Sequence, residues 1–172
     1  MPTLPPPVPL SQIGCPQTTA RALLERYDFF LLDAYGVLVH AAGAMPGAAE
    51  FLRAVKDAGK GFMVVTNDAS RLQATAARFY QGYGLDVSPE QVLTSGLLLK
   101  PFFETVGLEG ATCMVLGPDD SFQYVQEAGG IPIAPDATTE IDAVVLCDDA
   151  GYPFLKTMDD ILSNLCRHLD RG

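Results

Sequence analysis

The chain is poor in basic residues. Eleven Lys and Arg stand against 21 Asp and Glu, which gives the 172 residues a net charge of -10. This charge repels phosphate backbones and anionic lipid headgroups, so we expect neither nucleic acid nor a membrane surface as a partner. No apolar run approaches membrane-spanning length, and the proline-rich start MPTLPPPVPL lacks the basic and apolar regions of a secretion signal. We therefore expect a cytoplasmic protein.

Metal and redox motifs built on cysteine are also missing. The four cysteines are Cys15, Cys113, Cys147 and Cys166. They show no CxxC spacing and no nearby pair of histidines, so the sequence indicates neither a zinc site nor a dithiol redox site. We expect most of them to be buried thiols, which act as small apolar side chains and suit a reducing compartment. Surface roles are expected for His40 and His168.

The first half of the chain alternates apolar runs with helical segments. The expected elements are, in order, a helix capped by Thr18 or Thr19 that reaches Glu25, a strand over 29–32, a helix from Pro46 to Gly59, a strand over 62–65 and a helix over about 70–79. Both strands consist of consecutive apolar residues, which is typical of strands buried on two faces. This order predicts an α/β fold with a parallel sheet.

The second half repeats the alternation. The expected elements are a capped helix start at 88–90, a helix over 97–106 interrupted by Pro101, a strand over 112–116, a helix around 122–128, a strand over 143–147 and a final helix. The final helix carries an apolar stripe of Met158, Ile161, Leu162, Leu165 and Leu169. We expect this stripe to be its packed face.

Asp33 follows the first apolar run directly. In an open parallel sheet, ligands bind beyond the carboxyl ends of the strands, so a carboxylate at this point is well placed for reaction. A carboxylate can attack phosphorus and form an acyl phosphate, which divides one difficult displacement into two easier steps. Taken alone, however, such an aspartate more often caps the following turn.

Thr66 and Asn67 follow the second apolar run in the same way. A hydroxyl group and backbone amides at a strand end can hold the oxygens of a transferring phosphoryl group. A helix cap is again the plainer interpretation of this pair alone. A carboxylate and a hydroxyl at two strand ends are more specific together. We therefore predict that Asp33 and Thr66 lie at the ends of neighbouring parallel strands and face one cleft.

At these residues the chain resembles a known family. LLDAYGVLVH, followed by MPGAAEFLRAVKDAGKGFMVVTNDASR, is similar to the NagD-type branch of the haloacid dehalogenase (HAD) superfamily, which includes p-nitrophenylphosphatase-like enzymes. The similarity continues more weakly through VLGPDD and DAVVLC. It implies a Rossmann-like core with a parallel sheet, a mobile α/β cap of the C2 type, dependence on Mg²⁺ and an aspartyl-phosphate intermediate. The implied division is a proline-rich arm over 1–20, the N-terminal half of the core over 21–108 and a partial cap over 109–172.

The resemblance also implies roles for single residues. Asp33 would be the nucleophile and a Mg²⁺ ligand, the backbone carbonyl of Tyr35 would be a second ligand, and Thr66 with Asn67 would bind phosphate. The chain departs from the pattern at Tyr35, where these phosphatases usually carry a second aspartate as general acid and base. Loss of such a group costs on the order of 10²–10⁴ in rate. A noncatalytic, phosphate-binding HAD-like module is therefore the competing hypothesis.

Two further features bear on these alternatives. The string Asp-Ala-Tyr-Gly also resembles 2-haloacid dehalogenases, but the short spacing from Asp33 to Asn67 leaves no room for the helical cap that those enzymes insert there. The family also uses a downstream Lys and a downstream acidic pair, which normally follow the cap, where this chain has already ended. A truncated fragment of a longer fold is therefore a further alternative, and we expect the 172-residue chain alone to have no appreciable phosphatase activity. We expect Asp148-Asp149 to be a structural loop and Lys100 to be a solvated helix residue. The expected partner is a phosphorylated small molecule, and a homodimer is possible by resemblance.

Overall fold

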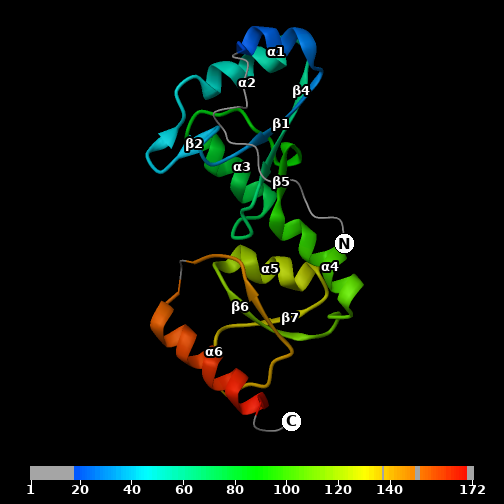
Figure 1. Cartoon of the computed structure of the whole chain (residues 1–172), viewed down its shortest axis with the longest axis vertical. Coiled ribbons are helices and arrows are strands. Elements are labelled where there is room, and N and C mark those ends of the chain that lie inside the picture. Colours follow the sequence, from blue (N-terminus) through cyan, green and yellow to red (C-terminus); the bar gives the residue numbers. More distant parts are fainter. Residues whose placement is uncertain (1–17, 137, 150–151, 170–172) are drawn as a thin grey trace, which may run out of the picture.

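The computed structural model describes residues 18–136, 138–149 and 152–169. Most of the expected arm over 1–20, together with Cys15, lies outside these residues. The described chain forms two units, each built on a three-stranded parallel sheet (Figure 1). The strand order is β1-β4-β5 in the first sheet and β7-β6-β8 in the second. The expected α/β class with parallel sheets is confirmed.

The first unit contains the elements expected from the first half of the chain and three short strands, β2, β3 and β5, that were not predicted. In order these are α1 (Ala20–Arg26), β1 (Phe29–Asp33), the short strands β2 (Val39–His40) and β3 (Gly43–Ala44), α2 (Ala48–Asp57), β4 (Gly61–Thr66), α3 (Gln73–Gly82), the 3-10 turn η2 (Pro89–Gln91) and β5 (Val92–Thr94). Thr19 caps α1, because its side chain accepts a hydrogen bond from the backbone N–H of Ala22.

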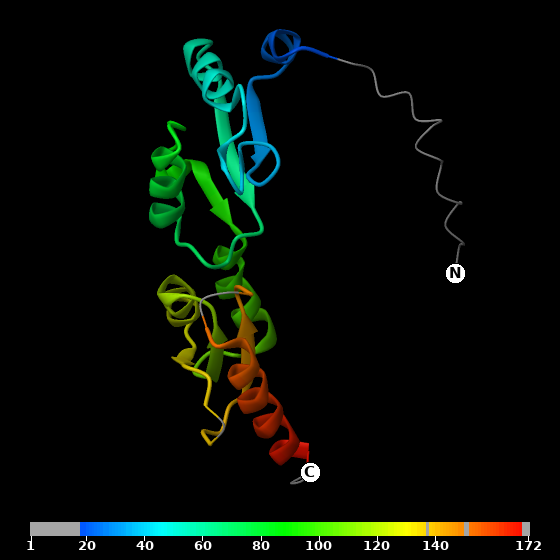
Figure 2. The ribbon, with the colours of Figure 1, turned by 90° about the vertical axis from the view of Figure 1, so that its left-hand side faces the viewer.

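The first sheet is covered on one face. Phe30, Phe62 and Val64 point to one side and form a buried cluster with residues of α2 and α3, such as Leu52 and Ala76. Figure 2 shows both helices on the same side of the strands.

The opposite face of this sheet is open. Phe29 is 56% exposed and Leu31 is 71% exposed. The expectation that the run 29–32 is buried throughout is therefore wrong. Phe29 and Leu31 are exposed because successive side chains of a strand point to opposite faces, and only one face of this sheet has helices packed on it.

The second unit contains η3 (Ser95–Leu98), α4 (Leu99–Val106), β6 (Thr112–Leu116), α5 (Asp119–Glu127), β7 (Ile131–Ile133), β8 (Ala143–Leu146) and α6 (Phe154–Leu169). Its sheet is covered on both faces. Cys113 and Val115 of β6 pack with Phe103 of α4 and with α5, whereas Met114 and Leu116 belong to a separate cluster that includes Ile161 of α6. Figure 2 shows α5 and α6 on opposite sides of this sheet.

Three expectations about the helices are corrected. Helix α3 begins at Gln73 rather than near Ser70, because the N–H groups of Ser70 and Leu72 bond to aspartate side chains. Pro101 does not interrupt a helix. It lies in the first turn of α4, where a backbone N–H has no intrahelical partner to lose.

The third correction concerns the stripe of α6. Leu162 is 60% exposed and Leu165 is also exposed, whereas Asn164 is buried. Asn164 Nδ2 donates to the carbonyls of Thr139 and Asp136, and this polar contact shares the packed face with Met158 and Ile161. The predicted stripe is therefore confirmed for those two residues and wrong for Leu162 and Leu165. The side chain of Leu169 lies outside the described residues.

The cysteines follow the expectation in part. Cys113 is buried in β6 and Cys147 is half-buried, but Cys166 is exposed on α6. The packing of Phe103 places α4 against the second sheet, and the division into 21–108 and 109–172 stays a prediction. No helix among the described residues has the length and apolar character needed to cross a membrane.

Candidate active site

Asp33 and Thr66 are the last residues of two neighbouring parallel strands. β1 and β4 pair in parallel with Phe30 opposite Phe62 and Asp33 opposite Val65, so both strands end at the same edge of the sheet. Asp33, Thr66 and Asn67 line a single cleft with a volume of about 730 Å³. The predicted placement of Asp33 and Thr66 is confirmed.

The turn after β1 orients the carboxylate of Asp33. Its Oδ1 accepts a hydrogen bond of 2.7 Å from the N–H of Ala34. The chain then reverses through Gly36, whose φ of 85° is in the region that favours glycine, and the N–H of Gly36 donates to the carbonyl of Val39. Tyr35 lines the cleft at this turn and is 68% exposed.

The segment between Asp33 and Asn67 is short. Among its elements are the β2-β3 hairpin and α2, followed by β4. This segment contains no inserted helical cap of the dehalogenase kind. The short spacing from Asp33 to Asn67 therefore leaves no room for that cap, as the sequence predicts.

The loop over residues 66–72 joins β4 to α3 and carries the predicted phosphate-binding residues. Asp68 organises this loop. Its Oδ1 accepts hydrogen bonds from the N–H and hydroxyl of Ser70, at 2.8 and 2.7 Å, and its Oδ2 forms an ion pair of 2.7 Å with Arg71. The hydroxyl oxygen of Thr66 in turn accepts from the N–H of Asp68. The Thr66 side chain also forms a hydrogen bond with the Tyr80 phenol, and a hydroxyl group can both donate and accept.

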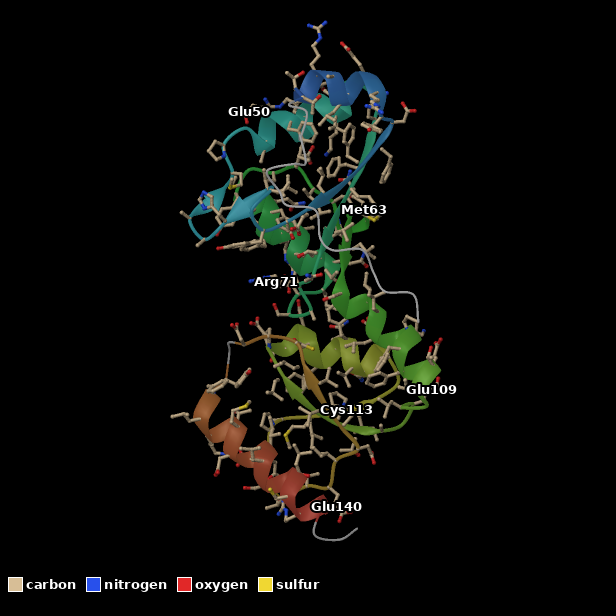
Figure 3. All side chains as sticks on the ribbon, viewed as in Figure 1. Glu50, Met63, Arg71, Glu109, Cys113 and Glu140 are labelled. Atoms are coloured by element: carbon tan, nitrogen blue, oxygen red, sulfur yellow. The ribbon has the colours of Figure 1, made fainter. Side chains whose placement is uncertain are left out.

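Aromatic side chains of α3 form one wall of the cleft. The ring of Phe79 contacts that of Tyr83, and the guanidinium of Arg71 lies 4.7 Å from the centre of the Phe79 ring. Figure 3 shows Arg71 at the junction of the two units. Burial raises the pKa of Tyr80, and the nearby Asp68 raises it further, so its phenol stays neutral at physiological pH.

The second unit supplies the opposite rim. Cys147, Asp148 and Asp149, which follow β8, line the same cleft. Asp148-Asp149 was expected to be a structural loop, and the structure brings it to the site. Burial raises the pKa of the Cys147 thiol, which disfavours the thiolate and hence a nucleophilic role.

Other cleft residues had no assigned role in the sequence. His40, expected at the surface, is half-buried on the wall, and its Nδ1 accepts from the N–H of Ala42. Arg71 is part of the string that resembles the NagD-type family, and Asp68 directly follows the Thr66-Asn67 pair, so the sequence contains a signal for both residues. The aromatic wall of the cleft could not be predicted from the sequence, because Phe79, Tyr80 and Tyr83 resemble ordinary core residues of a helix.

The donor atoms near Asp33 suit a hard cation. No group of three or more His, Cys, Asp or Glu that could hold a metal occurs among the described residues. The Asp33 carboxylate and the Tyr35 carbonyl are both oxygen donors. Mg²⁺ is commonly held by one or two carboxylates while it keeps several water molecules, so this small donor set fits it.

Comparison with known proteins identifies the class. Residues 30–131 match the family of haloacid dehalogenase-like hydrolases, and the chain belongs to that family. Within the family it is similar to NagD-type phosphatases, as expected from the strand-end motifs. Ribonucleotide monophosphatase NagD from Escherichia coli is 31% identical over 99 residues, which cover 58% of this chain and 39% of NagD.

Two further proteins show the extent of the similarity. Dihydroxyacetone phosphatase from Corynebacterium glutamicum is 32% identical over 125 residues, which cover 73% of this chain and 44% of that relative. A possible sugar phosphatase from Cytophaga hutchinsonii superposes with a TM-score of 0.77 at 26% identity, over 88% of this chain and 55% of that structure. The chain thus spans less than half the length of the curated relatives named here.

Proposed function

We propose that this protein hydrolyses small phosphate esters through an aspartyl-phosphate on Asp33. One observation carries the proposal: Asp33 and Thr66 end adjacent parallel strands and line the same cleft. A nucleophile and an oxygen-binding loop at one sheet edge are what phosphoryl transfer requires. The motif order shared with phosphatases of the family supports the same reaction.

The chemistry begins at Asp33. A carboxylate oxygen of Asp33 attacks phosphorus, an O–P bond forms, and the bond from phosphorus to the leaving alcohol oxygen breaks. The hydrogen bond from the Ala34 N–H holds the carboxylate in one orientation for this attack. Water then attacks the aspartyl-phosphate, which releases phosphate and restores Asp33.

The 66–72 loop would hold the phosphoryl oxygens. The Thr66 hydroxyl and the Asn67 side chain or N–H are the proposed donors. Arg71 lies in this loop and carries a positive charge, which its ion pair with Asp68 partly neutralises. Because the cleft also contains Asp33, Asp148 and Asp149, a dianionic substrate needs an added positive charge there.

A divalent cation would supply that charge, and we propose Mg²⁺. The Asp33 carboxylate and the Tyr35 carbonyl would hold it from the protein side. When bound, such a cation offsets the charge of the transferring group and of the nucleophile. The same residues therefore serve both attack and electrostatic balance.

The proposed substrates are small phosphorylated metabolites. The relatives are described as acting on dihydroxyacetone phosphate and ribonucleotide monophosphates. The net charge of -10 disfavours polymeric nucleic acid. A cytoplasmic location and a homodimer stay predictions, and sedimentation of the purified chain tests the second.

Tyr35 supports the competing function of a noncatalytic phosphate-binding module. It occupies the position of the expected acid-base aspartate and carries no carboxyl group that could donate a proton to the leaving alcohol. In the hydrolase proposal, the leaving alcohol would then take its proton from water. Esters with good leaving groups should accordingly react best.

The two functions are separated by turnover. Hydrolysis of p-nitrophenyl phosphate and of dihydroxyacetone phosphate is measured with and without Mg²⁺, on the 172-residue chain and on the complete gene product. Metal-dependent turnover that disappears in Asp33→Asn supports the hydrolase. Phosphate binding without turnover in either protein supports the noncatalytic module, and unchanged turnover in Asp33→Asn contradicts the mechanism.

A further inference from the structure

Helix α5 of the second unit is bonded to the backbone of the 66–72 loop in the first unit. The N–H of Leu72 donates to Asp120 Oδ2 at 2.9 Å, and the hydroxyl of Ser121 donates to the carbonyl of Ala69 at 3.3 Å. The Leu72 bond takes up an N–H just before the start of α3. Two side chains of α5 therefore help to hold this loop in its non-helical form.

Tyr124 makes a third contact from the same face of α5. Its hydroxyl donates a hydrogen bond of 2.8 Å to the carbonyl of Arg71, and it lies 2.5 Å from the hydroxyl of Thr94. A phenol has one proton, and a carbonyl can only accept, so Thr94 must be the donor to Tyr124. A directed series thus runs from Thr94 through Tyr124 to the loop backbone.

The position of Tyr124 is fixed on all sides. The side chains of Tyr124 and Thr94 are both buried. A Cβ atom added at Gly96 would lie 2.4 Å from the Tyr124 ring, so the ring packs directly on the backbone of η3. Burial raises the pKa of Tyr124, so the phenol keeps the proton that it donates to Arg71.

The strand register places this series beside the proposed phosphate site. Thr94, the last residue of β5, is paired with Thr66, the last residue of β4. Ser95 extends the support, because its hydroxyl donates a 2.8 Å hydrogen bond to the carbonyl of Asn67. Side chains from η3 and α5 therefore bond the loop backbone from Asn67 to Leu72, and Thr94 of β5 acts on it through Tyr124.

We infer that Tyr124 is a positioning residue for phosphate binding. Its hydrogen bonds to Thr94 of β5 and to the Arg71 carbonyl hold the loop that presents Thr66 and Asn67 in a fixed position relative to α5 and β5. This inference rests on the proposed function of that loop. It assigns the second unit a task beyond lining the rim of the cleft, since α5 sets the geometry of an oxygen-binding loop in the first unit. Tyr124 does not line the cleft, so it acts through the backbone.

Tyr124→Phe tests the inference, because it removes one hydroxyl group and keeps the ring. Amide hydrogen exchange is followed in the intact 172-residue chain. We expect exchange in residues 67–72 to accelerate about tenfold while the amides of β6 keep their protection. Tyr27→Phe is the matched control, since Tyr27 is exposed at the end of α1 and should leave loop exchange unchanged.

Gly96→Ala provides a second, independent variant. It keeps the Tyr124 hydroxyl but forces the ring to shift, so it should accelerate exchange in the same loop. Both variants should weaken binding of inorganic phosphate about tenfold, as measured by titration of the Asn67 amide resonance. Unchanged loop exchange in Tyr124→Phe, or an equal acceleration in β6, would overturn the inference. If the parent chain binds no phosphate, the proposed function fails, and the exchange data still decide the positioning role.

Discussion

The two parallel sheets have the same number of strands and different surroundings. In the second sheet, the central strand β6 buries Cys113 and Met114 on opposite faces, because α4 and α5 cover one face and α6 covers the other. In the first sheet, the central strand β4 buries Phe62 and Val64 on one face only. Met63 lies on the other face, away from α3 (Figure 3). A strand's conformation therefore follows from its own residues, but its burial depends on distant elements.

The ends of the strands differ as well. The first sheet ends in Asp33 and Thr66, whose polar groups line the cleft. In the second sheet, β6 is followed by Gly117, where an added Cβ would lie 2.4 Å from the hydroxyl of Ser121. This close packing fixes the start of α5 against β6, and side chains of α5 form hydrogen bonds with the 66–72 loop. One sheet thus carries the reactive groups, and the other supports them.

The largest expected effect concerns the reactive end of the first sheet. Tyr35→Asp should increase hydrolysis of an alkyl phosphate by about 10²-fold or more, because it supplies the missing proton donor. The gain should be smaller for p-nitrophenyl phosphate, whose leaving group needs no proton. Steady-state rates for both substrates in the complete gene product check this prediction.

Val37→Asp is the control for Tyr35→Asp. Val37 is exposed in the same turn but does not line the cleft, so an aspartate there adds the same charge without a catalytic position. An equal gain in both variants would indicate a general charge effect. No gain in Tyr35→Asp would show that proton transfer does not limit the reaction.

The difference in sheet burial predicts unequal costs for one substitution. Met114→Ala should lower the free energy of unfolding by about 2–5 kcal/mol, because it empties a packed core position. Met63 is half-buried on the open face, so Met63→Ala should cost less, about 1–2 kcal/mol. Guanidinium unfolding of the 172-residue chain measures both. Equal costs would mean that another molecule covers the open face in solution.

Much of this comparison could be predicted from the sequence. The apolar runs before Asp33 and Thr66 gave the two strands, and their parallel pairing followed from the intervening helix. The open face could not be foreseen, because the run 29–32 is as apolar as a strand covered on both sides. The start of α3 at Gln73 could not be predicted either, because it depends on a hydrogen bond from the Leu72 N–H to Asp120, 48 positions away in the chain.

A third prediction sharpens the account of α6. Asn164→Ala should lower the free energy of unfolding by about 1–3 kcal/mol, because the carbonyls of Thr139 and Asp136 lose a buried donor. Leu162→Ala on the exposed side should change it by about 0.5 kcal/mol or less. Thermal and denaturant unfolding of the two variants compare them directly. A larger loss in the free energy of unfolding for Leu162→Ala than for Asn164→Ala would indicate that the leucines form the packed face.

The smallest expected effect is a pH dependence of the second unit. Hydrogen bonds from Thr139, and then from the N–H and hydroxyl of Thr138, lower the pKa of Asp136 from its ordinary value of 3.8 to about 2. A lowered pKa in the folded state stabilises the fold above the ordinary value, and this contribution is lost as the pH falls from about 4 to 2. Asp136→Asn should therefore be less stable than the parent chain at pH 5 and should approach it near pH 2.

Melting temperatures across this range test the prediction, and Thr139→Val should shift the loss of stability toward higher pH because it removes the strongest of these bonds. Parallel curves for Asp136→Asn and the parent chain would show that these bonds do not contribute to stability.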